Sequence, residues 1–94
     1  MNIIWTKTSE LTLSEIVDYI ENKFGIIVSK KYYSDVLKTI DNIKVNPELF
    51  PIYRNNFLIR KAIINKKTIL YYQIQNENIN LLAFYDVRNG THKL

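Results

Sequence analysis

The 94-residue sequence contains no cysteine and only two glycines, two prolines and one histidine. The absence of cysteine excludes disulfide bonds and thiolate metal sites, and it fits the reducing environment of the cytoplasm. The scarcity of glycine and proline, together with 47% hydrophobic residues, favours a folded chain over a disordered one. We expect a single domain spanning residues 1–94, since this length supports one hydrophobic core.

Membrane segments and cofactor motifs are also missing from the sequence. No apolar run approaches the roughly 18 residues of a membrane span, and the first residues lack the pattern of a secretory signal. The lone histidine, His92, leaves a transition-metal site with almost no ligands. Paired carboxylates, a glycine-rich phosphate loop and a Ser/His/Asp set are absent as well. We therefore expect a cytoplasmic protein with no metal, no cofactor and no membrane association.

The excess positive charge lies in the second part of the chain. Residues 1–54 carry seven basic and seven acidic residues, whereas residues 55–94 carry six basic and two acidic ones, so the second part holds the whole net charge of +4. Such a basic region favours a polyanion or an acidic protein as partner. The alternative is a solvated basic surface that keeps the protein soluble. The six basic residues are Arg60, Lys61, Lys66, Lys67, Arg88 and Lys93.

The beginning of the chain is typical of a short strand followed by a helix. Residues 2–6 are rich in β-branched and aromatic side chains, as expected of a strand. Apolar residues then recur at helical spacing up to Phe24, and Gly25 is a typical stop signal. The motif Thr12-Leu13-Ser14-Glu15 fits a capping box and predicts the helix start there, while Ser9 is the cap of an alternative, earlier start.

A second helix is expected between Ser29, its predicted N-cap, and Asn46-Pro47, where proline interrupts the backbone hydrogen bonds. The link between the two helices is short, which favours an antiparallel helical hairpin. A connecting loop with Phe50 as its hydrophobic anchor follows. The apolar positions of the second helix that we expect in the core are Tyr33, Val36, Leu37, Ile40 and Ile43.

From Phe57 onward the apolar residues alternate as in strands. Strands are expected at about residues 57–64, 68–75 and 78–87. Tight turns are expected between them at Asn65-Lys66 and Asn76-Glu77, because asparagine tolerates the positive φ angles of such turns. These strands form a three-stranded antiparallel meander.

Both faces of the meander carry apolar residues, so one face is expected to hold the helices and the other to need a cover. In the last strand, strict alternation places Leu81, Ala83 and Tyr85 on one face. Leu82 and Phe84 then belong to the opposite face. The predicted fold class is α+β, with an N-terminal strand, an antiparallel helical hairpin and a three-stranded antiparallel meander in one four-stranded sheet.

This order of elements resembles the RelE/ParE superfamily of toxins from type II toxin–antitoxin pairs. The residues that carry the resemblance extend over nearly the whole chain, and as an ordered set they are more specific than any one of them alone. They are Ile4-Trp5-Thr6, Ile16-Val17-Asp18-Tyr19-Ile20, Asn46-Pro47-Glu48-Leu49-Phe50-Pro51, Arg60, Ile69-Leu70-Tyr71-Tyr72 and Phe84-Tyr85-Asp86-Val87-Arg88-Asn89.

The resemblance implies one of two activities. Members like RelE cut messenger RNA on the ribosome, with basic residues and a C-terminal tyrosine or histidine on the sheet, whereas members like ParE act on DNA gyrase and lack that catalytic set. Both kinds are neutralised by an antitoxin that wraps an extended or helical segment over the toxin. The RelE-like pattern has an arginine directly before the apolar pair and tyrosine of the third strand. In this sequence that position is Ile69 or Thr68, which favours the ParE-like branch.

Candidate site residues follow from the same comparison. RNA cleavage needs a proton acceptor, a proton donor and cations for the phosphorane charge, and the candidates are Arg60, Arg88 and His92. For binding a target or partner, the candidates are Arg60, Lys61, Lys67, Tyr85 and Arg88. Each has a structural alternative: an ion pair with Asp86 or simple exposure for the arginines, solvation for the lysines, packing for the tyrosine and an inert tail for His92.

We therefore expect a toxin that inhibits growth through its basic sheet, with DNA gyrase as its target and a cognate antitoxin as its partner. The toxin and the antitoxin are expected to form a hetero-oligomer. One alternative is a RelE-like endoribonuclease that cuts mRNA on the ribosome. Another is a non-toxic nucleic-acid- or protein-binding module of the same fold.

Overall fold

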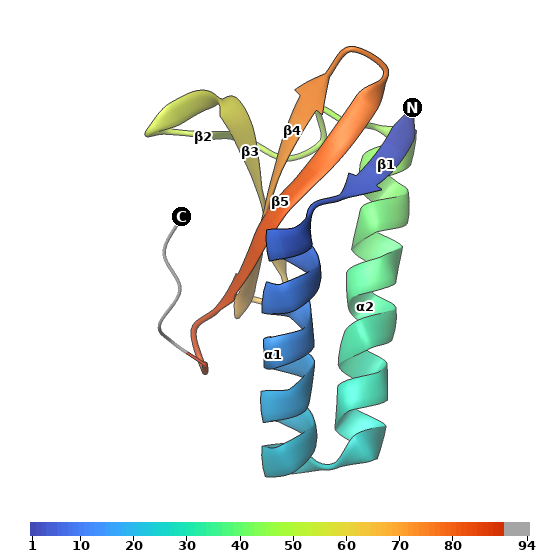
Figure 1. Ribbon diagram of the computed structural model, residues 1–94, viewed down its shortest axis with the longest axis vertical. Coiled ribbons are helices and arrows are strands. Elements are labelled where there is room, and N and C mark those ends of the chain that lie inside the picture. The colour runs from blue at the N-terminus through green and yellow to red at the C-terminus, as the bar shows by residue number, and fades with distance from the viewer. Residues whose placement is uncertain (90–94) are drawn as a thin grey trace.

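The computed structural model describes residues 1–89 and shows two helices packed against one face of a five-stranded sheet (Figure 1). The sheet order is β1-β5-β4-β3-β2, in which β1 runs parallel to β5 and the other neighbours are antiparallel. The predicted α+β fold is confirmed, with β2 as an additional strand. The elements are β1 (Asn2–Trp5), α1 (Lys7–Phe24), α2 (Ile26–Val45), β2 (Ile52–Tyr53), β3 (Asn56–Ile64), β4 (Thr68–Gln75) and β5 (Asn78–Asp86).

The first helix starts earlier than either predicted cap. Thr6 is its N-cap: the Thr6 Oγ1 atom accepts a hydrogen bond from the Ser9 amide at 3.1 Å and donates one to the Leu81 carbonyl at 2.7 Å. Thr12 is buried inside the helix instead, where its hydroxyl accepts a hydrogen bond from the Phe84 amide at 3.0 Å. The cap prediction was wrong because threonine side chains here connect α1 to β5 as well as to their own helix.

A single residue, Gly25, separates the two helices. Its φ of 94° lies in the region that glycine adopts without a side-chain clash, so α2 begins at once with Ile26. Ser29 is therefore not a cap but lies within α2, and its hydroxyl donates to the Ile26 carbonyl at 2.9 Å. The predicted antiparallel hairpin is confirmed, and its closed end projects beyond the sheet (Figure 1).

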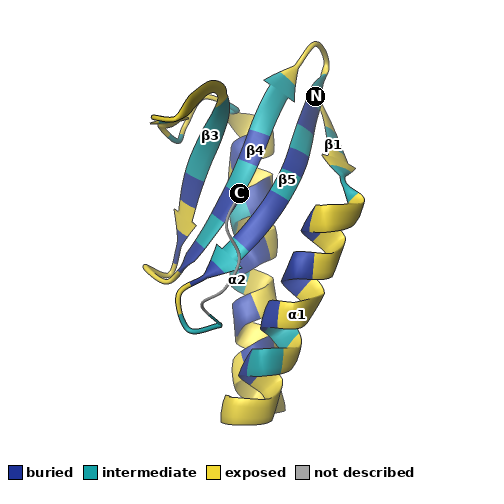
Figure 2. Ribbon diagram, turned by 60° about the vertical axis from the view of Figure 1, so that its left-hand side comes forward, coloured by how far each residue is buried: buried dark blue, intermediate teal, exposed yellow. Residues whose placement is uncertain are grey.

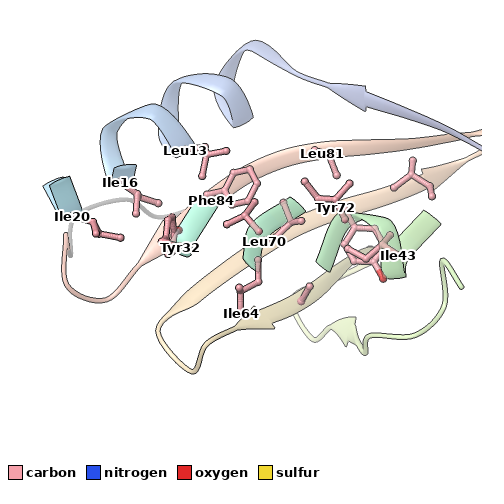
Figure 3. Close-up of a cluster of buried hydrophobic side chains, with 14 residues drawn as sticks. Leu13, Ile16, Ile20, Tyr32, Ile43, Ile64, Leu70, Tyr72, Leu81 and Phe84 are labelled. Carbon is pink, nitrogen blue, oxygen red and sulfur yellow. The ribbon is translucent and has the colours of Figure 1, made fainter. Parts of the chain in front are cut away.

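The core lies between the hairpin and the inner face of the sheet (Figure 3). The inward face of α2 differs from the predicted one, since Tyr32 is buried while Tyr33 and Leu37 are exposed. The apolar positions of α2 cover more than one face, and packing against α1 and β3 selects among them. The buried residues are Leu13, Ile16, Ile20, Tyr32, Val36, Ile40, Ile43, Ala62, Ile64, Leu70, Tyr72, Ile79, Leu81 and Phe84.

An irregularity in β5 changes which residues face the helices. Tyr71 pairs with Ala83 and Tyr72 with Leu81, so Leu82 is an extra residue between two regular segments. As a result Leu81 and Phe84 both point to the inner face, and the strict alternation predicted from the sequence was wrong. Buried and partly exposed segments alternate along β4 and β5 in Figure 2.

The predicted turns are confirmed. Asn65 and Lys66 between β3 and β4, and Asn76 between β4 and β5, have φ angles of 53°, 65° and 56°. Asparagine accepts this conformation more readily than most residues, because its short polar side chain bonds locally. The strands from β3 to β5 therefore form the expected meander, and the turn at residues 65–67 lies at the same end of the sheet as the end of β5.

Candidate functional site

Arg60 holds the loop that connects the helices to the sheet. It pairs with Tyr72 in the sheet register, and its Nη1 atom donates hydrogen bonds to the carbonyls of Phe50 at 2.8 Å and Glu48 at 3.4 Å. The Tyr72 hydroxyl donates to the Pro47 carbonyl of the same loop at 2.8 Å. Because Tyr72 faces the core, Arg60 lies on the helix side of β3, apart from the outer face of the sheet.

The outer sheet face is formed by the strand residues that alternate with the buried, helix-facing ones. The strand register shows which of these residues are neighbours. Lys61 pairs with Tyr71, and Ile69 pairs with both Ile63 and Tyr85 across β3, β4 and β5. We define this outer face by Tyr53, Lys61, Ile63, Ile69, Tyr71 and Tyr85.

At one edge of the outer face, two tyrosine rings and a lysine contact one another. The Tyr53 and Tyr71 rings meet edge to face with centroids 5.3 Å apart, and the Lys61 Nζ atom lies 5.8 Å from the Tyr53 centroid. Burial raises the pKa of Tyr71, so this phenol stays neutral at physiological pH. A hollow of about 720 Å³ opens beside these rings and includes Pro51, Ile52 and Ile63 among its lining. The combination suits an apolar side chain flanked by a carboxylate.

The predicted cations Lys67 and Arg88 meet at one end of the sheet, together with Lys66. The backbone connects them, since the Val87 amide donates to the Lys67 carbonyl at 3.0 Å. Lys66 and Lys67 are exposed, whereas Arg88 is partly buried. We call Lys66, Lys67 and Arg88 the basic end.

Arg88 forms an ion pair with Asp86, which is the structural alternative given for this arginine in the sequence. Its Nε atom donates to Asp86 Oδ1 at 2.9 Å and its Nη2 atom to Asp86 Oδ2 at 2.8 Å, which is a two-point ion pair. The hydrogen bonds to Asp86 raise the pKa of Arg88. Burial acts to raise the pKa of Asp86, but the hydrogen bonds from Arg88 and Thr68 outweigh it, and the pKa lies below its ordinary value. Both groups are therefore charged, and the pair as a whole is neutral.

A second hollow, which the sequence pattern does not predict, lies between the helices. It has a volume of about 750 Å³ and an apolar lining that includes Leu13, Val17, Tyr33 and Leu37. Carboxylates of α1 border it, together with Lys30 of α2. The exposure of Tyr33 and Leu37, which were predicted to be core residues, accounts for this hairpin groove, whose acidic border residues are Glu10, Asp18 and Glu21.

The structure divides the predicted site residues among three places. Lys61 and Tyr85 share the outer sheet face, Lys67 and Arg88 share the basic end, and Arg60 lies on the helix side of β3, where it binds the connecting loop. His92 lies outside the described residues. Within residues 1–89, no cluster of histidine, cysteine, aspartate or glutamate side chains is placed to hold a metal ion. No helix in the same part of the chain has the length and apolar character of a membrane span.

Known proteins share both the sequence pattern and the fold. The profile of the family described as "ParE toxin of type II toxin-antitoxin system, parDE" matches residues 3–91. A solved chain of the chromosomal ParDE TA system from P. aeruginosa aligns with a TM-score of 0.79 at 15% identity, covering 92% of this chain and 95% of that one. No curated protein matches the chain. The resemblance seen in the sequence is confirmed, and the chain belongs to the ParE toxin family of type II toxin–antitoxin systems.

Proposed function

We propose that this protein inhibits growth by acting on DNA gyrase and that a cognate antitoxin neutralises it. The observation that carries the proposal is the match to the ParE toxin family over residues 3–91. Membership of the ParE toxin family follows from this match. The gyrase target is what the resemblance to the ParE-like branch implies. The gyrase target and the inhibition of growth are what we propose beyond family membership.

The two positions at which a RelE-like toxin would carry its third-strand arginine, Thr68 and Ile69, support a toxin without nuclease activity. Thr68 is buried and its hydroxyl is hydrogen-bonded to Asp86, while Ile69 is an apolar residue of the outer sheet face. The two arginines that are candidate site residues are both engaged within the chain, Arg60 by loop carbonyls and Arg88 by a carboxylate. Stabilising a phosphorane requires cations aimed at the substrate, so these arrangements favour binding over cleavage.

Charge favours the outer sheet face over the hairpin groove as the antitoxin site. The outer face combines tyrosines and Ile63, which is 58% exposed, with Lys61, and it adjoins the basic end. An acidic, amphipathic antitoxin segment fits this composition. The hairpin groove is bordered by the carboxylates Glu10, Asp18 and Glu21 and by one cation, Lys30, so its net charge is negative and would repel such a segment.

Induction in cells with separate labelling of DNA and protein synthesis tests the target class. The proposal predicts that DNA synthesis stops first, accompanied by DNA damage, while protein synthesis continues. An immediate block of translation would instead support the endoribonuclease. Normal growth with the folded protein present would support the non-toxic binding module.

A pull-down with the cognate antitoxin tests the proposed docking face. Ile63→Asp places a like charge against an acidic segment on the outer face and is expected to weaken capture by at least about tenfold, since a buried unpaired charge is costly. Leu37→Asp is the matched control, because Leu37 is an exposed residue of the hairpin groove. If Leu37→Asp abolishes capture and Ile63→Asp does not, the antitoxin occupies the groove.

A further inference from the structure

A buried polar network joins α2, β4 and β5 at the basic end. The Tyr32 hydroxyl lies 2.9 Å from the Thr68 hydroxyl, Thr68 is hydrogen-bonded to Asp86, and Asp86 holds Arg88. Tyr32, Thr68 and Asp86 are 4%, 0% and 2% exposed. Such a network within an otherwise apolar core is costly to bury, and a hydrophobic substitute is often as stable, so its presence calls for a role besides stability.

The direction of each hydrogen bond in this network is determined. Asp86 is ionised and only accepts, so the Thr68 hydroxyl donates to it. With its proton committed, Thr68 accepts from Tyr32. Burial raises the pKa of Tyr32 to about 12, so this phenol keeps the proton it donates. The Tyr32 ring also faces the Arg88 guanidinium, whose Cζ atom is 5.8 Å from the ring centroid.

The same carboxylate organises the turn that follows β5. Asp86 Oδ1 accepts from the Arg88 amide at 2.9 Å, and the Asp86 carbonyl accepts from the Asn89 amide at 3.1 Å. The Val87 amide is bound to the Lys67 carbonyl. The turn at residues 86–89 is thereby fixed to the turn at residues 65–67.

An independent contact ties the second of these turns to α2. The Asn65 Nδ2 atom donates to Asp35 Oδ2 at 2.7 Å, and Asp35 is paired with Lys31 at 2.7 Å. Both turns of the basic end are therefore attached to the same helix, one through Tyr32 and the other through Asp35. Of the three cations at this end, Arg88 is neutralised by Asp86, and Lys66 and Lys67 are the exposed ones.

We propose that Tyr32, Thr68 and Asp86 form a latch, with Asp86 as the positioning residue, that holds the basic end in the shape the toxin presents to its target. Lys66 and Lys67 supply the charge that the target meets, and Arg88 ties down the turn at residues 86–89. This proposal rests on the proposed toxin function. Tyr32, Thr68 and Asp86 are buried and none of them belongs to the outer sheet face, so we expect latch variants to keep antitoxin capture.

Asp86→Asn removes the carboxylate and Thr68→Val removes the hydroxyl with little change of shape. Thr68→Ser keeps the hydroxyl and is the matched control. Ile79→Val or Ile79→Ala, at the opposite end of β5, serves as a stability control, chosen to match the loss in melting temperature. Each full-length variant is measured by amide exchange at residues 86–89, by growth arrest and by antitoxin capture.

In Asp86→Asn, the Arg88 amide is expected to lose about tenfold or more of its exchange protection, since its acceptor is altered. About tenfold more protein should be needed for growth arrest, with antitoxin capture unchanged. Thr68→Val should follow in the same direction, whereas Thr68→Ser and the Ile79 variant should arrest growth as the unaltered protein does. Replacing both Lys66 and Lys67 by glutamine should reduce growth arrest and leave exchange at residues 86–89 unchanged.

The proposal is overturned if Asp86→Asn and Thr68→Val arrest growth at unaltered potency, or if their loss equals that of the stability-matched Ile79 variant. If Asp86→Asn does not fold, Thr68→Val carries the same comparison. If the unaltered protein does not arrest growth, the proposed function fails. The exchange measurement still decides the latch in that case, because unchanged protection of the Arg88 amide in Asp86→Asn contradicts it.

Discussion

Arg60 and Arg88 are both predicted site residues, yet each is bound by acceptors from its own chain. Arg60 is held by carbonyl groups of the connecting loop, and Arg88 by the buried carboxylate of Asp86. The carboxylate of Asp86 cancels the charge of Arg88, whereas the carbonyl groups occupy the hydrogen-bond donors of Arg60 and leave its charge in place. Charge reversal at either position would therefore disturb structure as well as binding, and neutral or conservative substitutions are more informative.

The Asp86 ion pair predicts an acid-dependent stability. Its pKa in the folded state lies below the ordinary value of 3.8, so the stabilisation is present above that pH and is lost as the pH falls through the folded pKa. At pH 7, Asp86→Asn should lower the unfolding free energy by about 2–3 kcal/mol, less than for a fully buried pair because Arg88 is partly exposed. Urea unfolding of both proteins at pH 7 and at pH 3 measures this. A difference of the same size at both pH values would contradict it.

The hydrogen bonds from Arg60 to the connecting loop, which we call the Arg60 clamp, predict a separate effect on stability. Arg60→Met keeps most of the apolar stem and removes the hydrogen bonds to the loop, so the unfolding free energy should fall by about 1–2 kcal/mol. Arg54→Met, at an exposed position, is the control and should change it by less than about 0.5 kcal/mol. If Arg60→Met leaves stability unchanged but reduces toxicity, Arg60 contacts the target and is not a clamp.

Among the elements, the helical hairpin shows how far sequence patterns determine a buried face. The spacing of apolar residues correctly indicated both helices and their antiparallel arrangement, although both helices begin earlier than their predicted caps. The central positions Ile20 and Ile40 are buried. The spacing did not distinguish Tyr32 from Tyr33, because the apolar residues of α2 extend around the helix. The inward face was decided by contacts with α1 and with the sheet, whose strands are distant from α2 in sequence.

The candidate site was less predictable than the fold for the same reason. The ion pair of Asp86 with Arg88 was foreseen as an alternative, since the two residues are close in sequence. The contributions of Tyr32 and Thr68 were not, because they come from other elements. The extra residue Leu82 changes which side chains of β5 face the helices, and no turn residue in the sequence marks its position.

Packing of the hairpin on the sheet predicts large effects at its centre. Ile20→Ala and Ile40→Ala should each lower the unfolding free energy by about 2–5 kcal/mol, because each leaves a cavity in the core. Ile27→Ala, at a residue 81% exposed on the closed end of the hairpin, is the control and should have an effect below about 0.5 kcal/mol. Chemical denaturation of the three variants provides the comparison. Core losses as small as that of Ile27→Ala would show that the hairpin packs differently.

At the scale of the whole molecule, the two hollows differ in charge. The hairpin groove is bordered by carboxylates of α1, whereas the outer sheet face contains Lys61 and adjoins the basic end. The net charge of +4 arises from the part of the chain that forms the meander and its end. An acidic partner is therefore steered toward the sheet, and the helices present a surface of different chemistry.

The most direct test of the account is a supercoiling assay with purified DNA gyrase, relaxed plasmid and the purified protein. The proposed function predicts that the protein blocks supercoiling in a dose-dependent way and that prior addition of the cognate antitoxin prevents the block. The same preparation should leave mRNA intact on translating ribosomes. Full gyrase activity at a large excess of the folded protein, or cleavage of the ribosome-bound mRNA, would contradict the account.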